Sequence, residues 1–309
     1  MRSANIALLP SPSLRLPFPA QVGAFCLLWA SAFSVAKIAV TDCPPLLVLT
    51  ARFLLAALFV FAAAPALGLP LKLPRRDALI FALLGIANQA AYLGLSYLGI
   101  RSISSGLSAL IISSNPVLTA LAAAVFLNER MTWRNAAGLL LGIAGVAFVV
   151  DGRLAGGGES PVGVAFTVGA LLSLVCGTIL FKKLAPSGGL WVGNGVQSLS
   201  AGLATLPFAF SLETVDDIVP AWRLIVSLAY LALFVSVFAY LLWFRLLNVS
   251  GATAASSYHF LMPPLGLAFG WLLLGEQVTV SDLAGIVPVA IGIYLVTHPA
   301  MVRQAHHEG

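Results

Sequence analysis

The sequence predicts an all-α integral membrane protein with ten transmembrane helices, arranged as two inverted five-helix repeats. The first observation is composition: the 309 residues are 60% hydrophobic and only 9% charged, and the mean hydropathy is +1.01. A soluble domain carries roughly 25% charged residues, so the solvent around this chain is lipid. The second observation is that two apolar runs end in a similar sequence: "LNERMT" (127–132) recurs 147 residues later as "LGEQVT" (274–279).

A transmembrane helix needs about 20 mostly apolar residues. The chain contains ten such runs, separated by short connections rich in Pro, Gly and charged residues. Helices are therefore expected over 21–41, 45–67, 78–98, 103–127, 133–150, 161–181, 188–209, 222–243, 250–274 and 280–298. Residues 1–20 are rich in Pro and Ser and predict a disordered cytoplasmic tail, since no convincing small-residue cleavage site marks a signal peptide. Residues 299–309 are expected to form a second cytoplasmic tail.

Basic residues predict the orientation, because Lys and Arg are enriched in cytoplasmic loops. With the N-terminus in the cytoplasm, eleven basic residues fall on the inner side and only Arg101, Arg153 and Arg223 fall outside. Ten helices then return the C-terminus to the cytoplasm. The basic residues are scattered among apolar runs and form no continuous basic face, so the positive net charge does not indicate nucleic-acid binding.

The repeated ending belongs to a longer repeat. A shift of 147 residues places Pro116 on Pro263, Glu129 on Glu276 and Gly145 on Gly292. The units are 21–150 and 161–298, each with five helices, and the odd number inverts the second unit in the membrane. Inverted repeats accompany alternating-access transport through a site near the midplane; the alternative is a duplication retained for the fold alone.

Several stretches resemble the EamA-type transporters of the drug/metabolite transporter superfamily. They are "WASAF" (29–33), "ARFLLAAL" (51–58), "NPVLTALAAAVFLNERMTWRNAAGLLLGIAGV" (115–146) and its degenerate copy at 262–293. The resemblance implies a ten-helix carrier in the bacterial inner membrane that exports small metabolites, with a cavity among helices 1, 3, 4, 6, 8 and 9. The second copy departs from the first where Met262 replaces Asn115.

Polar residues inside the predicted helices are the candidates for the substrate cavity. All Asp and Glu fall in loops or at helix ends, so a carboxylate-type sodium or proton site is not expected. Asn88 and Gln89 share faces with Tyr92, at helical spacings of four and three. The three form a polar cluster on the cavity wall or, alternatively, link neighbouring helices. Asn115 is a further cavity candidate.

Prolines predict broken helices at two equivalent positions. Pro116 has no N–H and leaves the carbonyl of Ile112 without its helical donor. In the same way Pro263 leaves the carbonyl of His259 without a donor, and Pro264 removes the next donor. Broken backbone inside a membrane is tolerated where it faces protein or a wet cavity. These prolines are predicted gating elements, and a static kink is the alternative.

Aromatic and titratable residues complete the predicted cavity. Trp29 and Phe33 lie four apart on the first helix and are predicted to form an aromatic wall. Tyr258 and His259 are expected to line the cavity, with His259 as a proton carrier or as a hydrogen-bonded structural residue.

Two basic residues lie near the outer ends of predicted helices. Lys37 and Arg52 are predicted as charges at the outer mouth, either anchored at the interface or, for Lys37, holding a substrate carboxylate. The Gly138-x-x-x-Gly142 motif is expected to pack helices within the chain, and either a monomer or a weak homodimer is compatible with it.

The sequence thus favours a secondary transporter that exports small metabolites, among them amino acids or related compounds. A passive facilitator or channel is the main alternative, and a non-transporting subunit would need no polar cavity. An enzyme is not expected, because the helices hold no acid and the chain has no nucleophile elbow or phosphate loop. No cofactor or metal is expected. The partners are a small metabolite and the lipid bilayer, with the proton left open.

Overall fold

The computed structural model describes residues 17–127, 133–186 and 189–305, which contain helices and no strand. Glu129 and Arg130 lie outside the described residues. The helical elements are α1 (Phe18–Asp42), α2 (Pro45–Ala66), α3 (Arg75–Leu84), η1 (Gly85–Ala91), α4 (Tyr92–Ile100), α5 (Ser105–Ile112), α6 (Asn115–Phe126), α7 (Trp133–Ala155), α8 (Pro161–Leu184), α9 (Leu190–Leu212), η2 (Val215–Asp217), α10 (Trp222–Ala229), η3 (Tyr230–Ala239), α11 (Tyr240–Ser257), η4 (Tyr258–Leu261), α12 (Met262–Leu274) and α13 (Val280–Ala305).

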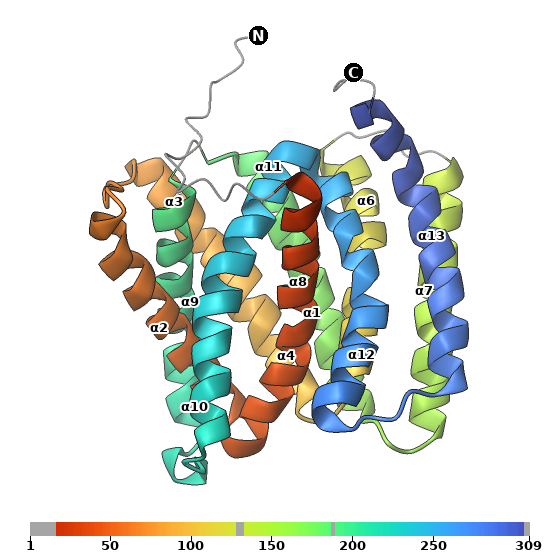
Figure 1. Ribbon diagram of the computed structural model, residues 1–309, viewed down its shortest axis with the longest axis horizontal. Helices are drawn as coiled ribbons and strands as arrows, with labels where there is room; N and C mark the ends of the chain where they lie inside the picture. Colours follow the sequence, from red (N-terminus) through yellow and green to blue (C-terminus); the bar gives the residue numbers. More distant parts are fainter. Residues whose placement is uncertain (1–16, 128–132, 187–188, 306–309) are drawn as a thin grey trace.

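The helices form one bundle in which α1 begins and α13 ends at the same end (Figure 1). Within the described ranges, seven helical segments are long and apolar enough to cross a membrane, and Met262–Leu274 and Val280–Gly292 are shorter apolar helices. Large apolar side chains point outward, among them Leu58 and Phe126, which are 65% and 61% exposed. Such a surface suits lipid, and the chain is a multi-pass membrane protein.

Local sequence signals set the helix starts. Pro45 and Pro161 stand at the first position of α2 and α8, where proline's missing N–H removes no hydrogen bond. The Ser160 side chain accepts a hydrogen bond from the backbone N–H of Gly163. The start of α2 has no side-chain cap of its own, and Glu213 from the end of α9 accepts from the N–H groups of Leu46 and Leu47.

Four membrane segments are not continuous α-helices. The backbone turns at Ser113 and Ser114, just before Pro116, and a 3-10 turn, η4, precedes Pro263. The helix breaks expected from these two prolines are therefore present. The π-helical segments η1 and η3 interrupt the two segments that precede the proline breaks, and such segments are often found at functional sites.

Gly251 separates the third and fourth membrane segments of the second half. The sequence predicts a connection between 243 and 250, but the helical segment that starts at α10 continues through η3 to residue 250. The backbone leaves helical geometry at Gly251, with φ 81° and ψ 174°. Residues with a side chain rarely adopt a positive φ of this size. Because a glycine suffices for the break, no loop is needed.

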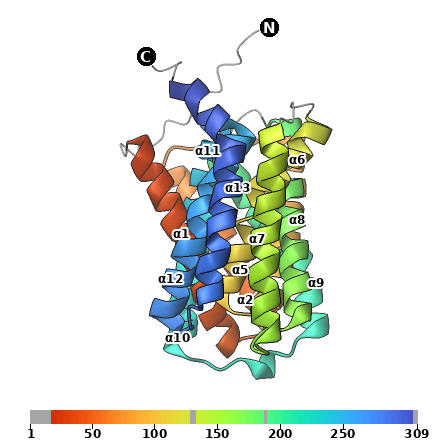
Figure 2. The ribbon, with the colours of Figure 1, turned by 90° about the vertical axis from the view of Figure 1, so that its right-hand side faces the viewer.

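The two halves pack by matched contacts. Helix α2 lies against α9, α5 against α12 and α7 against α13; Figure 2 shows α7 and α13 side by side. Contacts between non-equivalent segments of the two halves also come in pairs. Segment η1 packs on α9, and its counterpart η3 packs on α2. Likewise α4 packs on α8, and η3 packs on α1. The largest cluster of buried apolar residues follows α1, α4, α5, η3 and α11 through the centre.

Glycines allow α7 and α13 to approach closely. A methyl group added to Gly292 would come within 2.7 Å of the backbone nitrogen of Gly142, and one added to Gly145 within 2.9 Å of the Gly285 carbonyl oxygen. Small residues let helix backbones meet in lipid. The predicted packing of the Gly138–Gly142 motif within the chain is confirmed.

Candidate functional site

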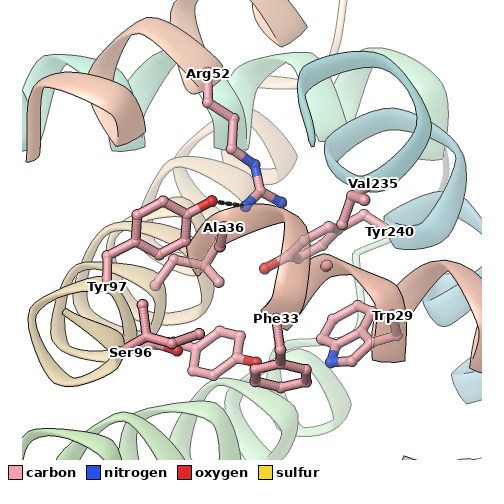
Figure 3. Close-up of a pocket in the computed structure, with 12 residues that line it drawn as sticks. Trp29, Phe33, Ala36, Arg52, Ser96, Tyr97, Val235 and Tyr240 are labelled. Atoms are coloured by element: carbon pink, nitrogen blue, oxygen red, sulfur yellow. Dashed lines mark hydrogen bonds between the residues drawn. The ribbon is translucent and has the colours of Figure 1, made fainter. Parts of the chain in front are cut away.

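A narrow cavity lies between α1, α2, α4, η3 and α11 (Figure 3). Its volume is only about 20 Å³, which is room for little more than a water molecule and far below the range for small-molecule pockets. In this conformation the walls are therefore closed around a space of water size. Most of its wall is aromatic, and Arg52 and Ser96 supply polar groups; the aromatic side chains are Trp29, Phe33, Tyr92, Tyr97 and Tyr240.

Arg52 is the charged residue of this cavity. Its side chain is almost fully buried, with the residue 1% exposed. Nε donates to the Ser236 hydroxyl at 2.7 Å and Nη1 donates to the Tyr97 hydroxyl at 2.8 Å. This placement differs from the expected anchoring at the outer interface, because Ser236 and Tyr97 offer acceptors inside the bundle.

Trp29 stands between the cavity and a second aromatic group. Its ring lies nearly parallel to that of Tyr92, with centroids 6.4 Å apart. It also meets the His259 ring edge-on at 5.6 Å. The ring centroids of Phe25 and Trp243 lie 5.5 and 5.0 Å from that of the same imidazole, so three aromatic rings surround it.

His259 is fully buried in this aromatic enclosure. Its Nδ1 lies 3.1 Å from the carbonyl oxygen of Ser256, while no residue that the structure describes forms a hydrogen bond with Nε2. The neighbouring Tyr258 points to the region where α1 begins: its ring meets Phe18 at 6.4 Å and its hydroxyl lies 3.3 Å from that of Ser250. Neither residue belongs to the cavity lining.

Asn88 and Gln89 lie behind the cavity rather than on its wall. The Asn88 side chain packs against Gly177 of α8, where no larger residue would fit. The Gln89 amide donates to the Asn194 side-chain oxygen at 3.5 Å, and Asn194 donates to the Ser236 carbonyl at 2.8 Å. These amides link η1 to α8, α9 and η3, whereas Tyr92 from the same predicted cluster lines the cavity.

Three of the four candidate residues at the two helix breaks are buried. Asn115 is fully buried and its side-chain oxygen accepts from the Thr119 hydroxyl at 3.1 Å. Pro116 and Pro263 are buried and Pro264 is exposed. None of the four lines the cavity.

Lys37 ties α1 to the turn between α4 and α5. Its ammonium group donates to the carbonyl oxygens of Ile100, Ile103 and Arg101 at 2.6, 2.8 and 3.3 Å. A lysine ammonium has three donors, and all three are used here.

Two carboxylates cap the start of α5 beside Lys37. Glu276, which follows α12, accepts from the Ser105 N–H at 2.7 Å, the Ser105 hydroxyl at 2.9 Å and the Gly106 N–H at 3.0 Å. Glu159 accepts from the N–H and hydroxyl of Ser104 at 2.7 and 2.6 Å. Negative charge is favourable at a helix N-terminus, so the second repeated ending joins the second half to the first.

Ion pairs at the same end also join the halves. Arg153 of α7 contacts Asp282 of α13 at 2.6 Å and Glu159 at 3.1 Å. Arg223 at the start of α10 pairs with Asp42 at the end of α1, with a bidentate geometry. Polar contacts therefore join the segments at this end of the bundle, and both Arg153–Asp282 and Arg223–Asp42 link residues from different halves.

Sequence reasoning missed three participants of the site. Ser96 and Tyr97 line the cavity. Helical spacing could have indicated them, because Ser96 follows Tyr92, and Tyr97 follows Leu93, by four positions on the same helix face. Tyr240 comes from the other half, and nothing local in the sequence indicates that it meets Tyr92.

Comparison with known proteins gives concordant matches. The model of the EamA-like transporter family matches residues 22–151 and again 161–298. An uncharacterized transporter of Bacillus subtilis is 30% identical, over 90% of this chain and 91% of that protein. A probable amino-acid metabolite efflux pump of Salmonella typhimurium is 30% identical, over 90% and 94% of the two chains. An S-adenosylmethionine/S-adenosylhomocysteine transporter of Chlamydia muridarum is 28% identical, over 88% of each.

A solved crystal structure shares the fold. It superposes with a TM-score of 0.65 at 17% sequence identity and covers 91% of this chain and 96% of its own. The predicted resemblance is thus confirmed by two family matches that together span most of the sequence, and the relatives are named as transporters. The chain belongs to the EamA-like transporter family.

Proposed function

We propose that this protein is an alternating-access secondary transporter that exports small organic metabolites, in particular amino acids or related compounds, across the bacterial inner membrane. The observation that carries the proposal is the cavity between the halves, which has aromatic walls and a buried guanidinium. Because it is closed to about 20 Å³ here, a substrate is admitted only when the halves move apart. Two of the relatives named above, the amino-acid metabolite efflux pump and the S-adenosylmethionine/S-adenosylhomocysteine transporter, are named for small metabolites. No group of this chain is assigned a catalytic role.

Ten membrane spans in two inverted units, 21–150 and 161–298, provide the mechanism. The paired contacts α2–α9, α5–α12 and α7–α13 support a two-fold relation between the units. In such a carrier one arrangement of the halves opens inward and its mirror opens outward. The broken helices at Pro116 and Pro263 lie at equivalent positions and serve as the moving elements.

The polar contacts at one end of the bundle form the outer gate. Glu276, Lys37 and Arg153 hold α5, α1 and α7 against groups from other parts of the chain, and all of these contacts are hydrogen bonds or ion pairs. Such contacts separate and re-form without disturbing the apolar core. The described conformation is thus the one closed to the outside.

Cysteine accessibility tests this topology. In a variant without the three native cysteines, Gly156→Cys is expected to react with an impermeant maleimide from outside, and Leu73→Cys only after the inner face is exposed. Labelling of both positions from the same side would end the inverted-repeat proposal and the placement of both termini in the cytoplasm.

Transport itself is tested in proteoliposomes loaded with radiolabelled amino acids. Efflux that saturates with substrate and shows trans-stimulation by substrate on the far side supports alternating access. A flux that rises linearly with concentration and shows no trans-stimulation indicates the facilitator or channel instead. Repeating the measurement with a pH gradient separates proton coupling from exchange.

A further inference from the structure

The buried guanidinium of Arg52 has no acidic partner in the part of the chain that the structure describes. Its hydrogen bonds go to two neutral hydroxyls, of Ser236 and Tyr97. Its second terminal nitrogen, Nη2, is buried and has no hydrogen-bond partner among the described residues. The ion pairs found among the described residues involve other cations, namely Arg76, Arg153 and Arg223.

An arginine stays charged in proteins, so burial does not neutralise this group. Removing an ion from water costs several kcal/mol even after the protein relaxes, and two neutral acceptors compensate only part of this cost. A negative charge that reaches Arg52 would therefore gain more than it gains at the protein surface. An anionic ligand would therefore be stabilised beside this charge.

The small cavity beside Arg52 is where such a ligand would bind once the walls move apart. Figure 3 shows its guanidinium directed toward the space between Tyr97, Tyr240, Phe33 and Trp29. Tyr97 accepts a hydrogen bond from Nη1, which leaves its own O–H free to donate. No Asp or Glu lines this space, so no carboxylate of the lining repels an anion.

We propose that Arg52 binds the carboxylate of the transported substrate, with Nη2 and the Tyr97 hydroxyl as donors. The inference rests on the proposed function and adds the substrate class: small organic acids, amino acids included. One monovalent carboxylate balances one guanidinium, whereas a phosphate dianion would leave an unmatched charge among aromatic rings. The organic part of the substrate packs on Trp29, Phe33 and Tyr92.

An amino group on the same substrate fits without an acidic residue. The faces of Trp29 and Tyr92 attract cations. Lys37 is not a rival for the carboxylate, because backbone carbonyls occupy its three donors.

Matched acids and amides test the assignment on the full chain in lipid nanodiscs. The probes are acetate, butyrate, 3-phenylpropionate, L-alanine, L-leucine and L-phenylalanine, each compared with its carboxamide. Tryptophan fluorescence reports binding, because Trp29 lines the cavity, and the thermal unfolding midpoint reports it independently. At least one acid is expected to bind and to raise the midpoint, and its amide to do neither.

Variants at position 52 test the residue. A hydrogen bond to a charged group contributes about 1.5–3 kcal/mol, so Arg52→Gln is expected to weaken acid binding by roughly 10- to 150-fold. Arg52→Lys keeps the positive charge but loses the planar guanidinium with its paired donors. Its affinity for acids is expected to lie between those of the wild type and Arg52→Gln. Arg101→Gln, which changes an exposed arginine, is the matched control and should bind as the wild type does. If Arg52→Gln does not fold, Arg52→Lys and the acid–amide comparison decide.

Several outcomes would overturn the inference: binding of no acid, equal binding of acids and amides, or acid binding unchanged in Arg52→Gln. Stabilisation by sodium chloride or inorganic phosphate alone would do the same, by assigning the site to an inorganic anion. The proposed function is judged separately. Saturable efflux of a neutral substrate would support the carrier function and contradict the carboxylate site. Binding of acids without any efflux would support the carboxylate site and contradict the carrier function.

Discussion

Glu276→Gln tests whether the carboxylate after α12 holds the outer end of the bundle closed. In the closed conformation one oxygen of Glu276 accepts from the Ser105 N–H, and the other accepts from the Ser105 hydroxyl and the Gly106 N–H. Glutamine keeps one acceptor oxygen, and in either orientation its NH₂ group faces a backbone N–H, of Ser105 or of Gly106, which cannot accept a hydrogen bond. The substitution therefore removes at least one charge-assisted hydrogen bond and the charge at the start of α5.

These contacts set the size of the effect. A hydrogen bond to a charged group contributes about 1.5–3 kcal/mol, and a charge at a helix terminus contributes about 0.3–1 kcal/mol. The closed state is thus weakened by roughly 2–4 kcal/mol. Since 1.4 kcal/mol corresponds to a factor of ten, the ratio of open to closed protein rises by roughly 30- to 700-fold.

The assay is the reaction of a buried cysteine with an impermeant maleimide added outside. Ala36→Cys places the thiol on the cavity wall, where the native residue is 3% exposed. In a background without native cysteines, its labelling rate follows the open fraction and should rise with Glu276→Gln until the open state predominates.

Glu213→Gln is the matched control. Glu213 also caps a helix at this end, by accepting from Leu46 and Leu47, but it joins α2 to α9 and not α5 to α12. It should leave the labelling rate at position 36 unchanged. An unchanged rate in Glu276→Gln, or an equal increase in Glu213→Gln, would refute the assignment of Glu276 to the gate.

Three further outcomes are expected. Pro116→Ala and Pro263→Ala each restore a backbone donor and should slow efflux while the protein remains inserted; wild-type rates in both would make the breaks structural only. His259→Gln should leave pH-driven accumulation unchanged. An imidazolium enclosed by these aromatic rings would lack a carboxylate partner, and an unpaired buried charge is costly. Loss of pH-driven accumulation with exchange intact would instead make His259 the coupling residue. Gly145→Ala crowds the Gly285 carbonyl oxygen and should destabilise the protein by about 1–3 kcal/mol, measured by unfolding against Gly23→Ala, where no atom lies within 4 Å; equal stability of the two variants would contradict close packing of α7 on α13.

The sequence alone determined the class of the protein and the positions of its helix breaks. Apolar runs of membrane length can form only helices or closed barrels in lipid, because every backbone polar group must be satisfied inside the chain. Proline removes a backbone donor wherever it stands, so the breaks before Pro116 and Pro263 needed no tertiary information. The same holds for Gly138 and Gly142, whose missing side chains predict a close helix contact.

The tertiary structure decided which polar groups meet. Asn88 and Tyr92 lie four residues apart on one segment, yet only Tyr92 reaches the cavity, because a neighbouring helix offers Asn88 a glycine to pack on. Glu276 was visible as a repeated residue, but its partner Ser105 lies 171 residues away. Helical spacing cannot predict such pairs.

Arg52 illustrates the same limit for a charge. Its position near the start of an apolar run predicts a side chain that reaches water, since a charged group in lipid is normally exposed or paired. Whether it turns inward depends on acceptors from other segments, and Ser236 lies 184 residues away. The sequence determined that a cation stands on the second helix, and only the packing of α2 against η3 and α4 decided that it lies inside the cavity.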